Sequence, residues 1–340
     1  MNSLLTCDFD YQLPANLISQ KPIKPRDQAR LLLLDKQTGQ IEHKIFKDLK
    51  NTLKTGDIIV LNNSKVIPAR LLGHKETGGK IELFLLTKIK AQTWQCLIKG
   101  KIQSQQKIIL PKNIIATAIT KDQNGENQAT WQVKFNVNDK KLFTVGETPL
   151  PPYIKAKSRA EEYQTVYAKP QGSVAAPTAG LHFTKKLIAD LKKRGIKFLN
   201  ITLHVGLGTF APVKTEKIID HQIHSELAIV DNKTATAINK AKTNGQRIIA
   251  CGTTAMRTLE AFTNTTGQLQ AGKKWVNIFI YPGYQFRLVD VLITNFHLPK
   301  STLLMLISAF ATRDIIMHAY AEAIKKKYRF FSFGDAMLIQ

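Results

Sequence analysis

The stretch Arg247-Ile-Ile-Ala-Cys-Gly-Thr-Thr-Ala-Met-Arg-Thr-Leu-Glu260 predicts a buried strand, a tight turn at Gly252 and a helix that runs through Phe262. This stretch belongs to the part of the chain after about residue 154, in which helical and strand patterns alternate. We expect helices over 184–194, 233–244, 301–311 and 314–328, a strand over 197–205, and a closing loop and strand over 329–339. This alternation predicts an α/β domain.

The middle of the chain has a different pattern. Short β-rich runs at 80–87, 93–99, 114–120 and 130–137 are separated by glycine turns, which is typical of a small antiparallel barrel or sandwich. The stiff segment Leu150-Pro-Pro-Tyr153 then leaves this block. We therefore expect an α/β main domain, formed by residues 1–65 and 154–340, with a small antiparallel β-barrel domain inserted at 66–153.

Size and composition narrow the functional classes. The chain has 340 residues, 44% hydrophobic and 22% charged, as in ordinary globular proteins. The longest apolar run, 303–311, is too short for a membrane helix, and residues 1–13 lack a signal-peptide pattern. The 3 cysteines are widely spaced and suggest reduced thiols. We expect a cytoplasmic enzyme with no membrane association, and a monomer, because no oligomerisation stripe stands out.

The formal net charge of +24 is carried mostly by lysines spread over the whole length. A polyanion is the most natural partner for such a chain, because each phosphate contact releases counterions. A lysine-rich proteome would produce the same excess. Charge therefore favours nucleic-acid binding without establishing it.

Two loops of small residues each carry a histidine. The first, Ser173-Val-Ala-Ala-Pro-Thr-Ala-Gly-Leu-His-Phe-Thr184, contains His182, and the second, Leu203-His-Val-Gly-Leu-Gly-Thr-Phe-Ala-Pro-Val213, contains His204. Glycine-rich loops let the backbone approach a ligand closely. The second loop is no dinucleotide-binding motif, because proline follows where a helix should begin. Together the two loops predict an enzyme site.

The turn at Gly252 can serve a ligand or the helix itself. Backbone N–H groups at 252–255 would point at an anion such as a carboxylate or phosphate, with the hydroxyls of Thr253 and Thr254 beside them. Alternatively, Thr254 only caps the helix. The pattern leaves both interpretations open.

The segment His221-Gln-Ile-His-Ser-Glu226 has a spacing that could hold a metal, but no fourth ligand is evident. On a strand, His224 and Glu226 would share one face. A hydrogen-bonded His224–Glu226 pair is the favoured interpretation, and we expect no metal. The aromatic loops 281–286 and 294–299 could stack on a nucleobase or simply close the core.

Taken in order, these segments resemble the S-adenosylmethionine:tRNA ribosyltransferase-isomerase family of the queuosine pathway. The matching segments are Phe9-Asp-Tyr-Gln-Leu-Pro14, Asn62-Asn-Ser-Lys-Val-Ile-Pro-Ala-Arg70, Thr77-Gly-Gly-Lys80, Leu150-Pro-Pro-Tyr-Ile154, Ala175-Ala-Pro-Thr-Ala-Gly-Leu-His-Phe183, Leu203-His-Val-Gly206, Gly252-Thr-Thr254, Tyr281-Pro-Gly283, Thr294-Asn-Phe-His-Leu-Pro-Lys-Ser-Thr302 and Tyr328-Arg-Phe-Phe-Ser-Phe-Gly-Asp-Ala-Met337. They span nearly the full length. Lys65 stands where the family often has arginine, and Thr312 where it usually has glycine.

The resemblance implies that the ribosyl part of S-adenosylmethionine is transferred and isomerised onto 7-aminomethyl-7-deazaguanine at the tRNA wobble position. Epoxyqueuosine forms, adenine and methionine leave, and S-adenosylmethionine is a consumed co-substrate rather than a cofactor. Histidines suit the proton transfers that this reaction needs. Three alternatives stay open: a conventional RNA methyltransferase, a basic RNA-binding protein, and a small-molecule enzyme.

On this interpretation the candidate residues form three groups. The catalytic candidates are His182, His204, His224 and Glu226. The substrate-binding candidates are Asp10, Arg26, Thr178, Gly180, Gly206, Gly208, Thr209, Gly252, Thr253, Thr254, Arg257, Tyr281 and Asn295, with 252–254 expected to hold the methionine carboxylate. The tRNA-binding candidates are Lys65, Arg70, Lys80, Lys185, Lys186, Lys192, Lys193 and Arg194.

Overall fold

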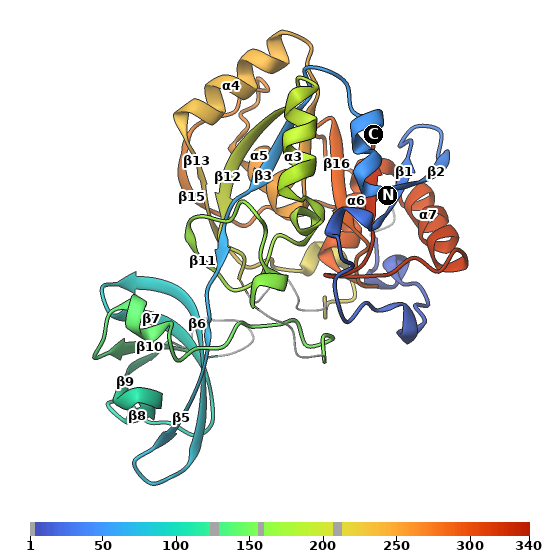
Figure 1. Ribbon diagram of the computed structural model, residues 1–340. Helices are drawn as coiled ribbons and strands as arrows, with labels where there is room; N and C mark the ends of the chain where they lie inside the picture. The colour runs from blue at the N-terminus through green and yellow to red at the C-terminus, as the bar shows by residue number, and fades with distance from the viewer. Residues whose placement is uncertain (1–3, 123–128, 156–159, 207–212) are drawn as a thin grey trace. The chain divides into compact units, whose positions relative to one another are not determined.

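The computed structural model describes residues 4–122, 129–155, 160–206 and 213–340 (Figure 1). The chain forms two compact units. Unit 1 comprises Met1–Ser64, Pro152–Pro170 and Ala176–Gln340, and unit 2 comprises Lys65–Pro151 and Gln171–Ala175. Unit 1 holds a large mixed sheet with helices, and unit 2 holds a closed antiparallel barrel. The predicted fold class is confirmed.

Unit 1 is built on a sheet of nine strands in the order β15-β13-β12-β3-β14-β16-β17-β1-β2. The strands are β1 (Arg30–Leu34), β2 (Ile41–Ile45), β3 (Ile58–Asn62), β12 (Lys197–Leu203), β13 (Glu226–Val230), β14 (Ile248–Cys251), β15 (Gly272–Val276), β16 (Val291–Asn295) and β17 (Ala336–Ile339). The four neighbours β12, β3, β14 and β16 run parallel to one another. Their carboxyl ends therefore meet at one edge.

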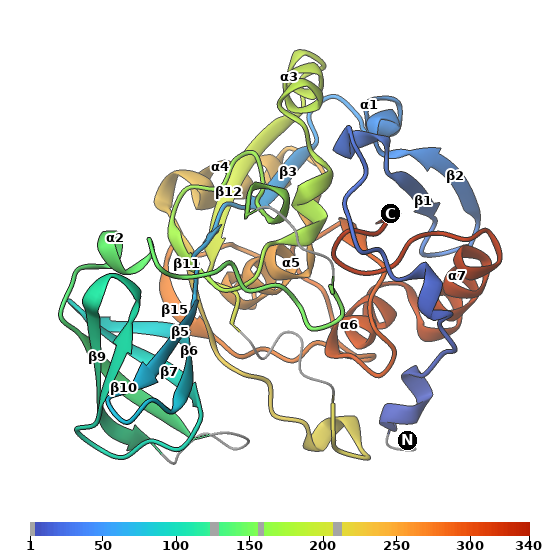
Figure 2. The ribbon, with the colours of Figure 1, turned by 60° about the horizontal axis from the view of Figure 1, so that its bottom comes forward.

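Helices cover both faces of this sheet. They are α1 (Leu49–Thr52), α3 (Lys185–Lys193), α4 (Asn232–Thr243), α5 (Thr253–Phe262), α6 (Thr302–Ala311) and α7 (Arg313–Lys325). Thr184 caps α3 by accepting from the Leu187 N–H at 3.1 Å, and Ser301 caps α6 in the same way from Leu304 at 3.2 Å. Figure 2 shows α3 and α5 on opposite sides of β3.

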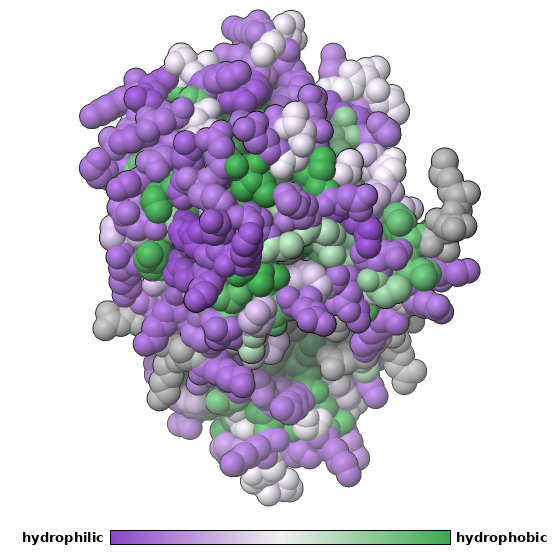
Figure 3. Space-filling view, turned by 90° about the vertical axis from the view of Figure 1, so that its right-hand side faces the viewer, coloured by the Kyte–Doolittle hydropathy of each residue, from purple (hydrophilic) through white to green (hydrophobic). Residues whose placement is uncertain are grey.

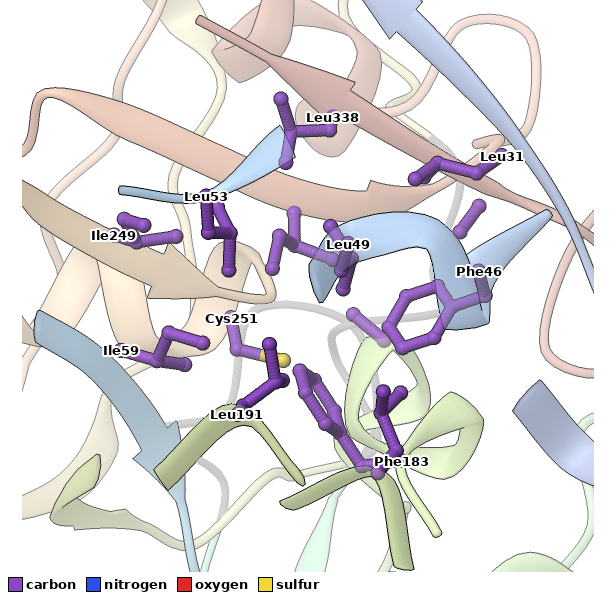
Figure 4. Close-up of a cluster of buried hydrophobic side chains, with 14 of the residues drawn as sticks. Leu31, Phe46, Leu49, Leu53, Ile59, Phe183, Leu191, Ile249, Cys251 and Leu338 are labelled. Atoms are coloured by element: carbon purple, nitrogen blue, oxygen red, sulfur yellow. The ribbon is translucent and has the colours of Figure 1, made fainter. Parts of the chain in front are cut away.

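The core beside α3 explains why the central strands β3 and β14 are mostly apolar. Residues of β14 alternate between the two faces. Ile249 and Cys251 join Ile59, Leu191 and Phe183 in one buried cluster, with the Cys251 sulfur among them (Figure 4). Burial raises the pKa of the Cys251 thiol to about 12. Cys251 is thus a protonated core residue and not a nucleophile.

The face that carries α7 and β2 is mostly hydrophilic (Figure 3). Among the residues that the structure describes, no single helix is both long and apolar enough to cross a membrane. Helices α6 and α7 reach that length and composition only together, across a bend of 113°.

Unit 2 is a closed barrel in the order β10-β7-β6-β5-β8-β9. Its strands are β5 (Arg70–Lys75), β6 (Lys80–Lys90), β7 (Thr93–Lys99), β8 (Lys107–Leu110), β9 (Ile114–Asp122) and β10 (Thr130–Phe135), with the short helix α2 (Asp139–Leu142). In addition, β4 (Lys65–Val66) pairs in parallel with β11 (Gln171–Ser173). This pairing brings residues 171–175 into unit 2, beyond the expected boundary at residue 153.

Candidate active site

The carboxyl ends of the four parallel strands bring polar side chains together. Asn62 ends β3, His204 follows β12, Gly252 follows β14 and Asn295 ends β16. The Asn62 amide joins two of these strand ends, because it donates to the Leu203 carbonyl at 3.0 Å and to the Thr254 hydroxyl at 3.3 Å. Open α/β sheets bind ligands beyond the carboxyl ends of their strands.

A pocket opens at this edge within unit 1. Its cavity volume is about 70 Å³, and it is open to solvent on one side. We call it the strand-end pocket; its lining residues include Tyr153, Thr178, Val205, Gly252, Thr253, Thr254, Thr294, Asn295, His297, Ser301 and Ser332. Of the predicted substrate-binding residues, Thr178, Gly252, Thr253, Thr254 and Asn295 line it.

Helix α5 begins at the wall of the pocket. Its N-cap is Gly252, with φ 91° and ψ 152°, and no side chain caps the helix. The alternative that Thr254 caps α5 is therefore wrong, because Thr254 lies inside the first turn and its hydroxyl accepts from Asn62. The first N–H groups of α5 are left for another acceptor, as an anion site requires.

His182 lies behind the pocket rather than in its lining. The side chain is 5% exposed, and its Nε2 faces the Asn295 Nδ2 at 3.2 Å. The same Nδ2 donates to the Phe331 carbonyl at 3.1 Å, which orients the amide, and the buried Oδ1 of Asn295 has no hydrogen-bond partner among the described residues. Burial lowers the pKa of His182 to about 4, so the ring is neutral at physiological pH. This geometry assigns His182 to positioning Asn295.

His204 is more accessible. Its Nδ1 lies 2.8 Å from the hydroxyl of Ser64, which fixes the plane of the ring, and the neighbouring Val205 lines the strand-end pocket. Burial, and to a smaller extent the charge of Lys273, lower the pKa of His204. His204 is therefore a neutral imidazole with a fixed orientation beside the pocket.

The structure contradicts the expected His224–Glu226 pair. Glu226 is 4% exposed and forms an ion pair with Arg257 at 2.5 Å, while its other oxygen accepts from the Gly206 N–H at 3.0 Å. His224 is exposed and precedes β13, so the strand alternation that would pair it with Glu226 does not extend to it. No group of three His, Cys, Asp or Glu side chains in the described parts of the chain is placed to hold a metal ion.

Arg257 and Arg26, both predicted to bind substrate, also contact protein groups. The Arg257 Nε donates to the Ile278 carbonyl at 3.3 Å, and Nη1 is held by Glu226. Arg26 donates to the backbone carbonyls of Gln164 and Glu161, both at 2.6 Å. Arg26 therefore fixes a loop in place, whereas the buried Nη2 of Arg257 has no hydrogen-bond partner among the described residues, and its role in substrate binding stays a prediction.

The other predicted substrate-binding residues are scattered. Asp10 forms a half-exposed ion pair with Lys300 at 2.9 Å. Tyr281 stacks with Phe279 at 5.1 Å between ring centroids. Gly180 is packed so closely that a Cβ there would lie 1.9 Å from the Tyr167 hydroxyl. Gly208 and Thr209 lie outside the described residues.

Sequence reasoning missed His297. Its Nε2 lies 2.8 Å from the Thr294 hydroxyl, and both residues line the strand-end pocket. Burial lowers the pKa of His297 to about 3. The motif Thr294-Asn-Phe-His297 was recognised as an aromatic loop, and its position directly after a parallel strand was the signal that could have selected the histidine.

The predicted tRNA-binding residues divide by their partners. Lys65, Lys80, Lys185, Lys192 and Lys193 are exposed. In contrast, Arg70 forms ion pairs with Glu82 at 2.6 Å and Glu147 at 3.0 Å, Lys186 pairs with Asp190 at 2.8 Å, and Arg194 donates to the Lys50 carbonyl. The three paired cations have less freedom to contact phosphate than the five exposed lysines.

Comparison with known proteins agrees with this geometry. The family model described as "Queuosine biosynthesis protein" matches residues 6–339. The S-adenosylmethionine:tRNA ribosyltransferase-isomerase of Thermosipho melanesiensis is 50% identical over 334 residues, covering 98% of each chain. That of Clostridioides difficile is 48% identical over 344 residues, covering 98% of this chain and 99% of its own.

A solved structure of S-adenosylmethionine tRNA ribosyltransferase from Thermotoga maritima is also similar. It has a TM-score of 0.57 and 38% sequence identity, and the match covers 98% of this chain and 100% of that one. The similarity therefore includes both the mixed sheet and the barrel. The chain belongs to the queuosine biosynthesis protein family.

Proposed function

We propose that the strand-end pocket binds S-adenosylmethionine and that this chain uses it to modify tRNA on the way to queuosine. The observation that carries the proposal is the meeting of the uncapped α5 N-terminus and neutral, fixed imidazoles at one edge of the sheet. One end of such a pocket suits a carboxylate, and the other suits proton transfer near neutral pH.

The chain is an S-adenosylmethionine:tRNA ribosyltransferase-isomerase. It transfers and isomerises the ribosyl moiety of S-adenosylmethionine onto 7-aminomethyl-7-deazaguanine at the tRNA wobble position. The product is epoxyqueuosine in tRNA, and adenine and methionine are released. S-adenosylmethionine is consumed as a co-substrate, and we propose that the reaction uses no resident cofactor or metal.

The N-terminus of α5 supports binding of the methionine carboxylate. The N–H groups of Thr253 and Thr254 belong to the first helical turn and have no acceptor within the helix. The helix dipole adds partial positive charge at this end. A carboxylate bound here would place the rest of S-adenosylmethionine beside the end of β16, where Thr294 and Asn295 line the pocket.

His204 is the best-placed group for a proton transfer to or from substrate. The reaction needs a base for the proton on the ribose carbon beside the sulfonium, and a neutral nucleobase amine to attack. With Nδ1 held by Ser64, the Nε2 of His204 has no hydrogen-bond partner among the described residues and could bond to a ligand. His297 can exchange a hydrogen bond with the departing adenine, and the unpartnered Oδ1 of Asn295 can accept one from a substrate hydroxyl or amine.

The same proposal includes the polyanionic partner. Exposed lysines on α3, including Lys185, Lys192 and Lys193, and those of unit 2, including Lys65 on β4 and Lys80 on the barrel, would contact tRNA phosphates. The chain would act as a monomer in the cytoplasm. Sedimentation with and without tRNA would test the oligomeric state, and a complex containing two copies per tRNA would contradict it.

The function is tested by incubating the protein with S-adenosylmethionine and a tRNA that carries 7-aminomethyl-7-deazaguanine. We expect adenine and methionine in equal amounts and a ribosyl-derived mass gain on the tRNA. S-adenosylhomocysteine with a methyl-sized gain would identify a methyltransferase instead. His204→Gln should lose turnover, whereas His318→Gln, which alters an exposed histidine on α7, should retain it. Equal rates for the two variants would exclude His204 from the chemistry.

A further inference from the structure

Strand β15 lies at the edge of the nine-stranded sheet and carries an exposed tryptophan. Trp275 is 53% exposed, although tryptophan is highly buried on average. The other two tryptophans of the chain, Trp94 and Trp131, are 3% and 8% exposed and lie in the barrel. An exposed tryptophan on an edge strand offers an aromatic surface that a binding partner can cover.

The register of β13 and β15 places Trp275 in a strip of four residues. Trp275 lies opposite Leu227, and Lys273 lies opposite Ile229. Because side chains alternate along a strand, these four residues share one face of the sheet. Leu227 and Ile229 are only partly buried. We call Leu227, Ile229, Lys273 and Trp275 the β15 strip.

Helix α5 packs on the opposite face and leaves the strip uncovered. Glu226 and Lys274 mark that opposite face, since Glu226 pairs with Arg257 of α5 and the Lys274 ammonium lies 4.5 Å from the centroid of the Phe262 ring. The β15 strip therefore lies on the face of the sheet opposite α5.

The strip is continuous with the candidate active site. The His204 N–H donates to the Leu227 carbonyl at 2.9 Å, which joins the end of β12 to the strip. The charge of Lys273 reaches the His204 ring and contributes, after burial, to lowering its pKa. A ligand that extends from the strand-end pocket past His204 would meet Leu227 and then Trp275, with Lys273 beside them on the same face.

We propose that the β15 strip is a contact surface for the tRNA substrate, where Trp275 stacks on an unpaired nucleobase and Lys273 faces a neighbouring phosphate. Basic surfaces with exposed aromatic rings bind single-stranded nucleic acid in this way. The proposal rests on the proposed function, because that function brings an unpaired anticodon loop to His204. Pairing of β15 with a second copy is disfavoured, because it would bring Lys273 and Lys274 of each copy together.

The test uses Trp275→Ala and Trp275→Phe, with Ile219→Ala as a matched control at a residue that is 65% exposed and outside the strip. We expect Trp275→Ala to weaken tRNA binding by about tenfold, and Trp275→Phe to retain most of the affinity because it keeps a stacking ring. The control should bind as the wild type does. For Trp275→Ala, the turnover rate at saturating tRNA should fall by a smaller factor than the affinity for tRNA.

Fluorescence gives an independent readout, because Trp275 is the tryptophan that a quencher can reach. Binding of tRNA should protect the wild-type emission from acrylamide, and this protection should be lost in the Trp275 variants. The proposal would be overturned if Trp275→Ala bound tRNA with unchanged affinity and tRNA left the wild-type emission unprotected. A wild-type dimer that Trp275→Ala dissociates would overturn it as well. Absence of adenine release by the wild type would instead overturn the proposed function.

Discussion

Gly180 provides a sharp test of what the glycines of the first histidine loop do. A Cβ added at Gly180 would lie 1.9 Å from the Tyr167 hydroxyl oxygen, 3.0 Å from its ring carbon Cζ and 3.1 Å from Thr165 Cγ2. Tyr167 packs against the hydrophobic core, so its ring cannot move aside freely. Overpacking of this kind costs about 1–3 kcal/mol. We therefore expect Gly180→Ala to lower the free energy of unfolding of unit 1 by that amount.

The double variant Gly180→Ala with Tyr167→Phe separates packing from ligand binding. Removing the hydroxyl removes the 1.9 Å contact and loses only a weak interaction with the buried Cys251 thiol. The second change should therefore recover about 1 kcal/mol or more in a double-mutant cycle. Gly206→Ala is the control, because no described atom lies within 4 Å of its added Cβ.

Urea titration followed by helical circular dichroism reports on unit 1, which holds all the helices longer than one turn that the structure describes. A Gly180→Ala protein as stable as the wild type would refute the packing argument. So would a deficit that Tyr167→Phe leaves unchanged. If Gly206→Ala lost as much stability as Gly180→Ala, the loop would be sensitive to side chains in general and the specific contact would not be the cause.

Four further predictions concern charge, protons and backbone strain. Arg257→Met leaves Glu226 buried without its cation and should lower the free energy of unfolding by about 3–5 kcal/mol, and adding Glu226→Gln should recover part of this in a urea double-mutant cycle. The pKa values of His182 and His297, about 4 and about 3, lie below the ordinary 6.5, so as the pH falls the unfolded chain binds these protons first. The contribution of these two histidines to the free energy of unfolding should be fully present above about pH 6.5 and should fall below that pH, by up to about 1.4 kcal/mol per pH unit for each. In a His182→Asn variant, the free energy of unfolding should fall less steeply with decreasing pH. Affinity for tRNA should fall linearly on a log–log plot against salt, by about 10³ between 50 and 200 mM for roughly six phosphate contacts, and a flat plot would contradict phosphate binding. Thr312 has φ 69°, where a β-branched residue is strained, and its hydroxyl caps α7 by accepting from the Ile315 N–H at 3.4 Å. Thr312→Gly relieves the strain and loses the cap, so it should raise stability by less than about 1 kcal/mol in thermal unfolding, whereas Thr312→Ala keeps the strain, loses the cap and should lower stability.

The fold could be predicted from the sequence wherever local pattern decides the structure. Thr184 and Gly195 mark the two ends of α3 because a capping hydroxyl and a left-handed residue act within a single turn. The strand order of the sheet was not predictable in this way. Pairing of β17 with β1 joins residues about 300 positions apart, and that choice depends on packing of the whole core rather than on either strand alone.

The candidate site was found in outline because its loops are unusual in composition. His204 directly follows a parallel strand and adjoins Val205 of the pocket lining, although it is not itself in that lining, and its catalytic role stays a prediction. His182 follows no strand and lies behind Asn295. His297 was missed because the aromatic loop 294–299 is equally typical of a segment that packs into the hydrophobic core. The error at His224 has a clear physical origin, because strand periodicity was applied to a residue that precedes the first residue of β13.

Three glycines that look alike in the sequence have three different physical reasons to be glycine. Gly180 is required by the Tyr167 hydroxyl, which takes the space of a Cβ. Gly252 is required by its φ of 91°, which lets α5 begin directly at the end of β14. Gly206 has open space at its Cβ position and a backbone N–H bound to Glu226. Neither packing against the described residues nor a left-handed backbone explains Gly206, and we predict that clearance for substrate does. An alanine there should therefore raise the KM for S-adenosylmethionine or tRNA without loss of stability.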